Sequence, residues 1–90
     1  MVLLSKGREL KLIDRILNNS DRDAADELVS QHYKNIYKHI YIKLKDEELS
    51  MDLTQETFIA ALKGLGTFDA GKASFGTWLS RIADNKITDY

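Results

Sequence analysis

The sequence of 90 residues contains no proline. Average usage would place about four or five prolines in a chain of this length. Because proline is frequent in turns and confined to the edges of sheets, its absence disfavours a fold with many strands and turns. The length also suits one small domain rather than two. We therefore predict an all-α fold, a compact bundle of about four helices with no sheet, in a single domain over residues 1–90.

Apolar residues recur at helical spacing in the first half of the chain and predict two helices there. The first is expected over about residues 8–17. Its buried face should carry Leu10, Ile13 and Leu17. The second is longer, over about residues 23–44, and either Ser20 or Asp21 can cap its start. Its core positions should be Leu28, Ile36, Ile40 and Leu44.

Aromatic and histidine side chains add two further lines to this second helix. Tyr33, Tyr37 and Tyr41 recur every four residues, which is typical of the edge of a core rather than of a platform for stacking bases. His32 and His39 are about 10 Å apart along the helix axis. They cannot share one metal ion without a third element, and the sequence holds no other histidine. We interpret both as ordinary helix residues and expect no metal site.

The second half of the chain predicts two more helices. The third should begin near residues 49–52, with Ser50 as a candidate N-cap, and end at Gly64. A polar, glycine-containing loop over residues 66–74 follows, and Ser74 can cap a fourth helix directly after it. The apolar positions of the third helix are Leu53, Phe58, Ile59, Ala61 and Leu62, and the inner stripe of the fourth should carry Phe75, Trp78, Leu79, Ile82 and Ala83. No stop signal follows, so we expect a fragment whose last helix continues.

Charge is distributed unevenly, although the net charge is only −1. Residues 1–45 carry nine basic and six acidic side chains, and residues 57–90 carry four basic and three acidic ones. Residues 46–56 between them carry five acids and no base. This run predicts an acidic surface that suits a basic partner. The alternative is a solvated loop and helix start, where acids interact favourably with the helix dipole.

The sequence does not group the residues that catalysis needs. It has no cysteine, which excludes a disulfide scaffold and a thiolate site, and it has no Walker-type loop or His-Glu-x-x-His motif. Asp52 and Glu56 share a helix face, but a di-metal bundle needs further glutamates and Glu-x-x-His motifs. We expect no enzyme and no cofactor. No apolar run approaches the roughly 18 residues of a membrane span, so we expect a cytoplasmic protein without membrane insertion.

Two motifs in the second half stand at a characteristic distance from each other. Residues 52–58 read Asp-Leu-Thr-Gln-Glu-Thr-Phe, Phe68-Asp69 follows, and residues 75–85 read Phe-Gly-Thr-Trp-Leu-Ser-Arg-Ile-Ala-Asp-Asn. Together they resemble region 2, the second domain, of a sigma-70 family transcription initiation factor of the small extracytoplasmic-function (ECF) type. The resemblance covers about residues 8–90. It implies a module that binds core RNA polymerase and recognises and melts the promoter −10 element.

The resemblance also implies a polymerase-binding surface. In the family, the Asp-Leu-x-Gln-Glu helix docks on a basic coiled coil of the clamp in the largest polymerase subunit. Carried over, the contact residues are Met51, Asp52, Gln55, Glu56, Phe58, Ile59 and Leu62. Carboxylates on one helix face can accept paired hydrogen bonds from arginine, in agreement with the acidic run. For Phe58 and Leu62 a core position is the alternative.

A DNA-binding surface follows from the same resemblance. In the family, the loop before the fourth helix and the outer face of that helix grip the −10 element, and the loop holds one flipped base of the non-template strand. The implied DNA-binding residues are Lys72, Ser74, Thr77, Trp78, Arg81, Asn85 and Lys86. Cations can contact phosphates and Asn85 a base edge. Trp78 can stack on a base or belong to the core, and Asp84 should share the outer face.

The resemblance has two departures and leaves one alternative. Trp78 is the single aromatic residue where housekeeping members carry a cluster, which favours the ECF type. We expect the basic tail and the helix-turn-helix domain of the family to lie beyond Tyr90. The alternative is a sigma-like interaction domain that binds polymerase or an anti-sigma factor without reading DNA. The retained Lys72, Arg81 and Asn85 favour promoter reading, which would take place at the bacterial nucleoid.

Overall fold

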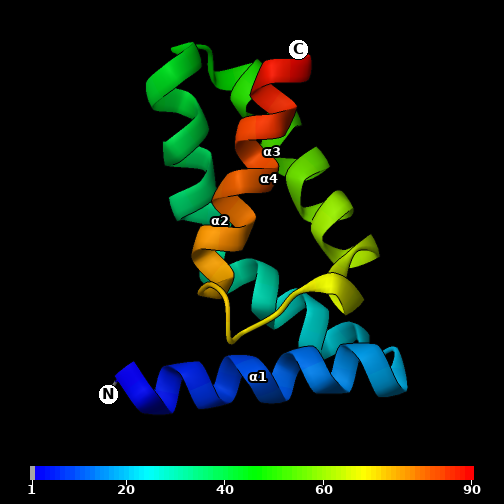
Figure 1. Cartoon of the computed structure of the whole chain (residues 1–90). Coiled ribbons are helices and arrows are strands. Elements are labelled where there is room, and N and C mark those ends of the chain that lie inside the picture. Colours follow the sequence, from blue (N-terminus) through cyan, green and yellow to red (C-terminus); the bar gives the residue numbers. More distant parts are fainter. Residues whose placement is uncertain (1) are drawn as a thin grey trace. The chain divides into compact units, whose positions relative to one another are not determined.

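The computed structural model describes the backbone of residues 2–90 and the side chains of residues 7–90. Over this range it contains four α-helices, one 3₁₀ turn and no strand (Figure 1), which confirms the predicted all-α class. The elements are α1 (Val2–Asn19), α2 (Arg22–Leu44), α3 (Glu47–Lys63), η1 (Leu65–Thr67) and α4 (Phe75–Asp89). The chain divides into two compact units, residues 1–31 and residues 32–90.

The first unit holds α1 and the start of α2, and a short polar turn joins them. Ser20 adopts a left-handed conformation with φ of 50°, and α1 ends just before it at Asn19, two residues after the predicted end near residue 17. The Asp21 carboxylate accepts a hydrogen bond from the Ala24 N–H at 3.0 Å and one from Arg15 Nε at 2.9 Å. Asp21 rather than Ser20 therefore caps α2, and these donors lower the pKa of Asp21.

The buried face of α1 differs from the expected one. Leu12 and Ile13 are buried, whereas Leu10 and Leu17 are 42% and 51% exposed. Of the three predicted positions only Ile13 is correct. Two apolar registers overlap in this short helix, because Leu10, Leu12, Ile13 and Leu17 lie around much of its circumference. Spacing alone could not decide which register faces inward.

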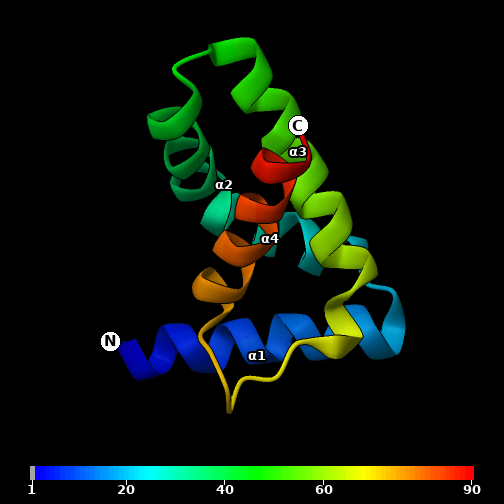
Figure 2. The same ribbon diagram turned by 45° about the horizontal axis from the view of Figure 1, so that its top comes forward.

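The second unit holds the rest of α2 together with α3, η1 and α4. Figures 1 and 2 both show α3 running beside α4, and these two helices pack at close range. Small side chains on their buried faces permit this approach, among them Ala61 on α3 and Ala83 on α4. The buried apolar residues of this unit are Ile36, Ile40, Leu53, Phe58, Ala61, Leu65, Phe75, Leu79 and Ala83. Of the expected inner stripes of α2 and α4, Leu28, Ile36, Ile40, Phe75, Leu79 and Ala83 are buried, whereas Leu44, Trp78 and Ile82 are only half-buried.

The N-terminus of α3 lies earlier than expected, and Ser50 does not cap it. Asp46 is the N-cap: its backbone is extended and its carboxylate accepts a hydrogen bond from the Leu49 N–H at 2.9 Å. Glu47 and Glu48 fill the first turn, where carboxylates interact favourably with the helix dipole. With the start moved to Glu47, Ser50 falls in the interior of the helix and is fully buried.

Three buried hydroxyl groups follow one another along α3. Thr54 and Thr57 donate to the backbone carbonyls of Ser50 and Leu53, both at 2.7 Å. These bonds satisfy the two threonine hydroxyls and allow polar residues to stand in the core. The Ser50 hydroxyl is equally buried but has no partner among the side chains that the structure describes. Burying such a group without a partner costs stability.

Replacing Ser50 should therefore stabilise the fold. We expect Ser50→Ala to raise the free energy of unfolding by roughly 0.5–1.5 kcal/mol, since it removes a buried unpaired hydroxyl and favours the helix. Chemical denaturation followed by circular dichroism measures this. Ser30→Ala, at an exposed position of α2, is the matched control and should show only the helix-propensity part. A loss of stability in Ser50→Ala would contradict the assignment.

Candidate functional site

One face of α3 is exposed along its whole length and combines charge with apolar surface. Met51 and Ile59 are 48% and 55% exposed. Asp52, Gln55 and Glu56 are exposed beside them, at spacings that place all five on one side of the helix. Neither carboxylate has an ion-pair partner within residues 7–90. This face can therefore offer two carboxylates and an amide around an apolar strip.

Phe58 does not belong to that face. It is only 6% exposed and stacks on Tyr33 of α2, with ring centroids 5.9 Å apart and an interplanar angle of 10°. The expectation that Phe58 contacts a partner is wrong, and the alternative, a position in the core, is correct. Leu62 is half-buried and lies at the edge of the core. The remaining five residues keep the accessibility that a binding surface needs.

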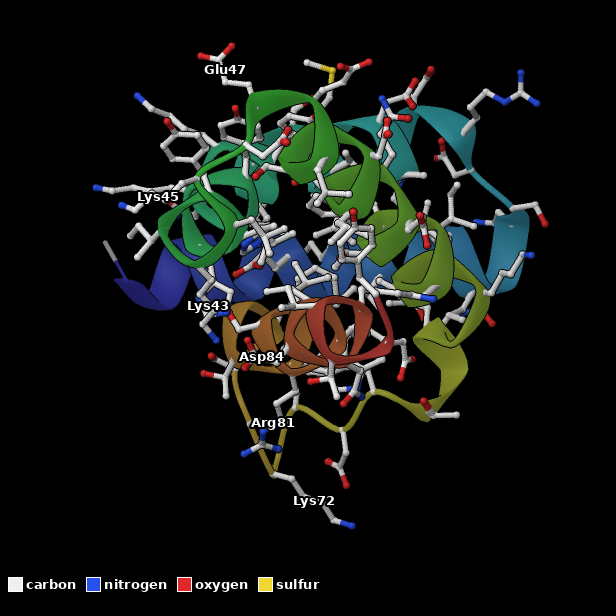
Figure 3. The ribbon with its side chains drawn as sticks, turned by 90° about the horizontal axis from the view of Figure 1, so that it is seen from above. Lys43, Lys45, Glu47, Lys72, Arg81 and Asp84 are labelled. Carbon is white, nitrogen blue, oxygen red and sulfur yellow. The ribbon has the colours of Figure 1, made fainter. Side chains whose placement is uncertain are left out.

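The acidic run extends this face toward the start of α3. Glu47 and Glu48 are exposed, and Asp46 is exposed although its carboxylate caps the helix. The two readings of the run are thus compatible, because the same acids favour the helix start and remain open to a partner. In Figure 3, Glu47 lies on the opposite side of the view from Lys72 and Arg81.

The loop before α4 is organised by Asp69. Its carboxylate accepts a hydrogen bond from the Gly71 N–H at 2.8 Å, and its carbonyl accepts one from the Lys72 N–H at 3.0 Å. Ser74 ends the loop as the predicted N-cap of α4, accepting from the Thr77 N–H at 3.1 Å. The Ser74 hydroxyl also donates to Thr77 Oγ1 at 2.9 Å. These two bonds commit the Ser74 hydroxyl to the cap.

Trp78 joins an aromatic cluster that fastens the loop to α4. Its ring centroid lies 5.2 Å from that of Phe68 in the loop and 5.7 Å from that of Phe75. Phe75 in turn meets the ring of His32 from α2, with centroids 5.1 Å apart. Trp78 is half-buried. The alternative of a core position therefore fits the buried part of its ring, while the rest of the side chain stays exposed. Aromatic rings at such separations contribute to packing beyond their buried area.

The outer face of α4 carries a smaller set than expected. Thr77, Arg81 and Asn85 are exposed on it, and Lys72 is exposed on the preceding loop. Figure 3 shows Arg81 and Lys72 pointing outward on one side of the molecule. The expectation that Lys86 lies on this face is wrong. It is five residues after Arg81, and five residues rotate an α-helix by about 140°. Lys86 is half-buried and lines a groove with Leu53 and Glu56 of α3 and with Asp89 and Tyr90.

Asp84 is tied to α2 instead of standing open on the outer face. Its Oδ1 atom lies 2.8 Å from Lys43 Nζ and 2.8 Å from His39 Nε2. The Lys43 hydrogen bond and then the His39 hydrogen bond lower the pKa of Asp84. This cross-link was not predicted from the sequence. Its only trace in the sequence is the spacing of His39 and Lys43, which places both on one side of α2.

A polar groove opens between α2 and the first turns of α4. Its volume is about 420 Å³. The residues that line it are His32, Asn35, Ile36, His39, Ser74, Gly76, Thr77 and Ser80. Of the loop, only Ser74 reaches it. The α2 residues were not predicted as site residues, although His32, Asn35 and His39 repeat at helical spacing on a side distinct from the tyrosines.

Among the described residues no group of three or more histidine, cysteine or acidic side chains could hold a metal ion. No described helix is long and apolar enough to cross a membrane.

Comparisons with known proteins give a consistent result. The family model of sigma-70 region 2 matches residues 28–90. The ECF RNA polymerase sigma factor BldN of Streptomyces coelicolor is 35% identical over 83 residues, which cover 92% of this chain and 31% of BldN. The RNA polymerase sigma-H factor of Pseudomonas aeruginosa is 35% identical over 88 residues, 98% of this chain and 45% of that protein. The chain thus spans less than half the length of these relatives. No solved structure matches significantly.

The Asp84 cross-link predicts a pH-dependent stability. Because the folded pKa of Asp84 lies below its ordinary 3.8, its stabilisation is present above that value and is lost as the pH falls through the lowered pKa. Asp84 is 46% exposed, so we expect Asp84→Asn to cost less than about 1 kcal/mol at neutral pH. Thermal unfolding of parent and variant should converge in strong acid. Asp52→Asn is the control, and an Asp84→Asn deficit that persists in strong acid would contradict the prediction.

Proposed function

The chain belongs to the sigma-70 family of transcription initiation factors, as an ECF-type region 2, and from this premise we propose that it binds core RNA polymerase through α3 and opens the promoter −10 element through α4. The observation that carries the proposal is the exposed face of α3, which holds Asp52, Gln55 and Glu56 around Met51 and Ile59. Exposed apolar residues that are rimmed by polar ones are typical of protein-binding surfaces.

The proposed partner of this face is a basic coiled coil of the polymerase clamp. Arginine side chains can bind the carboxylates of Asp52 and Glu56 in pairs of hydrogen bonds. Met51 and Ile59 then supply the apolar centre, where exclusion of water strengthens the charged contacts. An anti-sigma factor with a similar basic and apolar surface would compete for the same residues. The site of action would be the cytoplasm, at the nucleoid.

The proposed DNA contacts lie on the separate outer face of α4 and on the loop. Lys72 and Arg81 would bind phosphates and set the position of the strand, whereas Asn85 and Thr77 would contact base edges. Trp78 can offer an exposed ring edge to a base while the rest of the ring packs in the aromatic cluster. Holding an unpaired base favours the melted promoter, because it offsets part of the cost of unstacking.

Charge reversal on α3 tests polymerase binding. We expect Asp52→Lys plus Glu56→Lys to weaken binding to core polymerase at least about thirtyfold, because lost charge pairs at an interface cost roughly 2–5 kcal/mol. Fluorescence anisotropy of the labelled chain with core enzyme measures this. Asp14→Lys plus Asp26→Lys changes the net charge equally at two exposed residues elsewhere and should bind like the parent. Equal losses in both variants would leave no specific role for α3.

Base substitution tests promoter reading. With core polymerase bound, we expect the chain to prefer single-stranded over duplex −10 DNA. Asn85→Ala should relax discrimination at one position, where a wrong base costs roughly 1–3 kcal/mol. Lys72→Ala should weaken all sequences about equally and reduce the salt dependence. Competition binding with single-base variants of a promoter strand measures both effects. Polymerase binding without any discrimination among strands would favour the interaction domain that does not read DNA.

A further inference from the structure

The exposed sides of α2 and α3 form one continuous surface whose two edges carry opposite charges. We propose that two copies of the chain pair through this surface, and that the pairing covers the face of α3 to which the proposed function assigns polymerase binding. The pairing itself depends only on the charges and the shape of the surface. Its regulatory consequence, that a paired copy cannot bind polymerase, rests on the proposed function.

The basic edge of the surface is a pair of lysines on α2. Lys34 and Lys38 are exposed and, being four residues apart, lie on one side of the helix. Neither forms an ion pair with a carboxylate within residues 7–90. Like charges at this spacing destabilise a helix. The described part of the chain therefore leaves these two cations side by side without a counter-charge.

The acidic edge is a pair of carboxylates on α3 with the same spacing. Asp52 and Glu56 are exposed and four residues apart, and they too have no ion-pair partner in the described range. Four residues advance an α-helix by about 6 Å, so the acidic pair and the lysine pair have equal lengths. One pair can therefore face the other, and their contact would offset the repulsion within each.

The middle of the surface, between the two edges, is a hollow of about 310 Å³. The side chains that line it are Tyr33, Lys34 and Tyr37 of α2 and Met51 of α3. The Tyr33 ring is held in place by its stacking on Phe58. Met51 is 48% exposed, and an unbranched methionine side chain adapts to irregular spaces. In the proposed pair, Met51 of each copy fills the hollow of the other copy.

The order of these features makes the surface complementary to a copy of itself. Along α2, Lys34 and Lys38 are rotated by about 100° and 140° from Tyr33, which faces α3. Along α3, the two carboxylates follow Met51 at the same intervals, one and five residues later. The hollow thus has the basic edge on one side and the acidic edge on the other. A two-fold axis through the hollow brings each basic edge onto the acidic edge of the other copy, which closes the pair.

Sedimentation velocity of the chain alone, over a series of concentrations, tests the pairing. We expect a species of twice the mass of one chain, which dissociates in high salt because salt screens exposed charges. Two charge-reversed variants, Lys34→Glu plus Lys38→Glu and Asp52→Lys plus Glu56→Lys, should each weaken the dimer at least about tenfold, because like charges then face each other. A parent that stays monomeric up to about 1 mM would overturn the proposal.

The control reverses two charges away from the surface. Lys11→Glu plus Arg22→Glu changes the net charge as much as the lysine variant does, at exposed residues of α1 and of the start of α2. We expect this control to dimerise like the parent. An equal loss in the control would reduce the effect to net charge and overturn the assignment of the edges.

Mixing the two charge-reversed variants gives the sharpest measurement. One variant carries acids on both edges and the other carries bases on both, so neither matches itself but each matches the other. A 1:1 mixture should therefore form a heterodimer at concentrations where each variant alone is monomeric. A mixture that stays monomeric, with both variants folded by circular dichroism, would overturn the proposal. Species larger than two copies would overturn the two-fold arrangement, because a head-to-tail contact does not close.

Polymerase binding separates this inference from the proposed function. With the parent at a concentration where most of it is paired, Lys34→Glu plus Lys38→Glu should bind core polymerase at least about threefold more tightly, because more of its copies are free to bind. Weaker binding by this variant would show that polymerase itself occupies the basic edge, and would overturn the masking. A parent that dimerises, together with a monomeric variant that does not bind polymerase, would contradict the proposed function and support the pairing alone.

Discussion

The close packing of α3 against α4 is the constraint on which the rest of the second unit depends. The two helices run close together, and small residues such as Ala61 and Ala83 are fully buried on them. Because both helices turn their buried faces toward a shared core, their exposed faces are left on different sides. The proposed polymerase surface on α3 and the proposed DNA surface on α4 would therefore not compete for the same space.

Polar contacts then decide which α4 side chains remain available. Asp84 is drawn to Lys43 and His39 of α2, and Ser74 is committed to its own helix cap. Lys86 turns toward Glu56 and Asp89 on the other side of the helix. The side chains that remain exposed are the two cations Lys72 and Arg81 and the polar residues Thr77 and Asn85. In the proposed function, so few phosphate contacts would give only modest affinity for DNA by itself, and tight binding would depend on the polymerase complex.

The helix α2 links the two surfaces. One of its sides packs through Tyr33 on Phe58 of α3, and another meets α4 through His32 and His39. The groove on this second side is neutral although Asp84 and Lys43 lie beside it, because their charges are paired.

The sequence by itself determined the helical class, the four helices, the Ser74 cap and the exposed face of α3. These features depend on local spacing, capping chemistry and motifs, which are properties of short segments. Only the tertiary structure decided that Phe58 stacks in the core, that Lys86 faces away from Arg81 and that Asp84 is bound to α2. It also assembled the groove from residues more than thirty positions apart. The physical reason is that burial and ion pairing depend on which helix faces meet, and periodicity within one helix does not specify its neighbour.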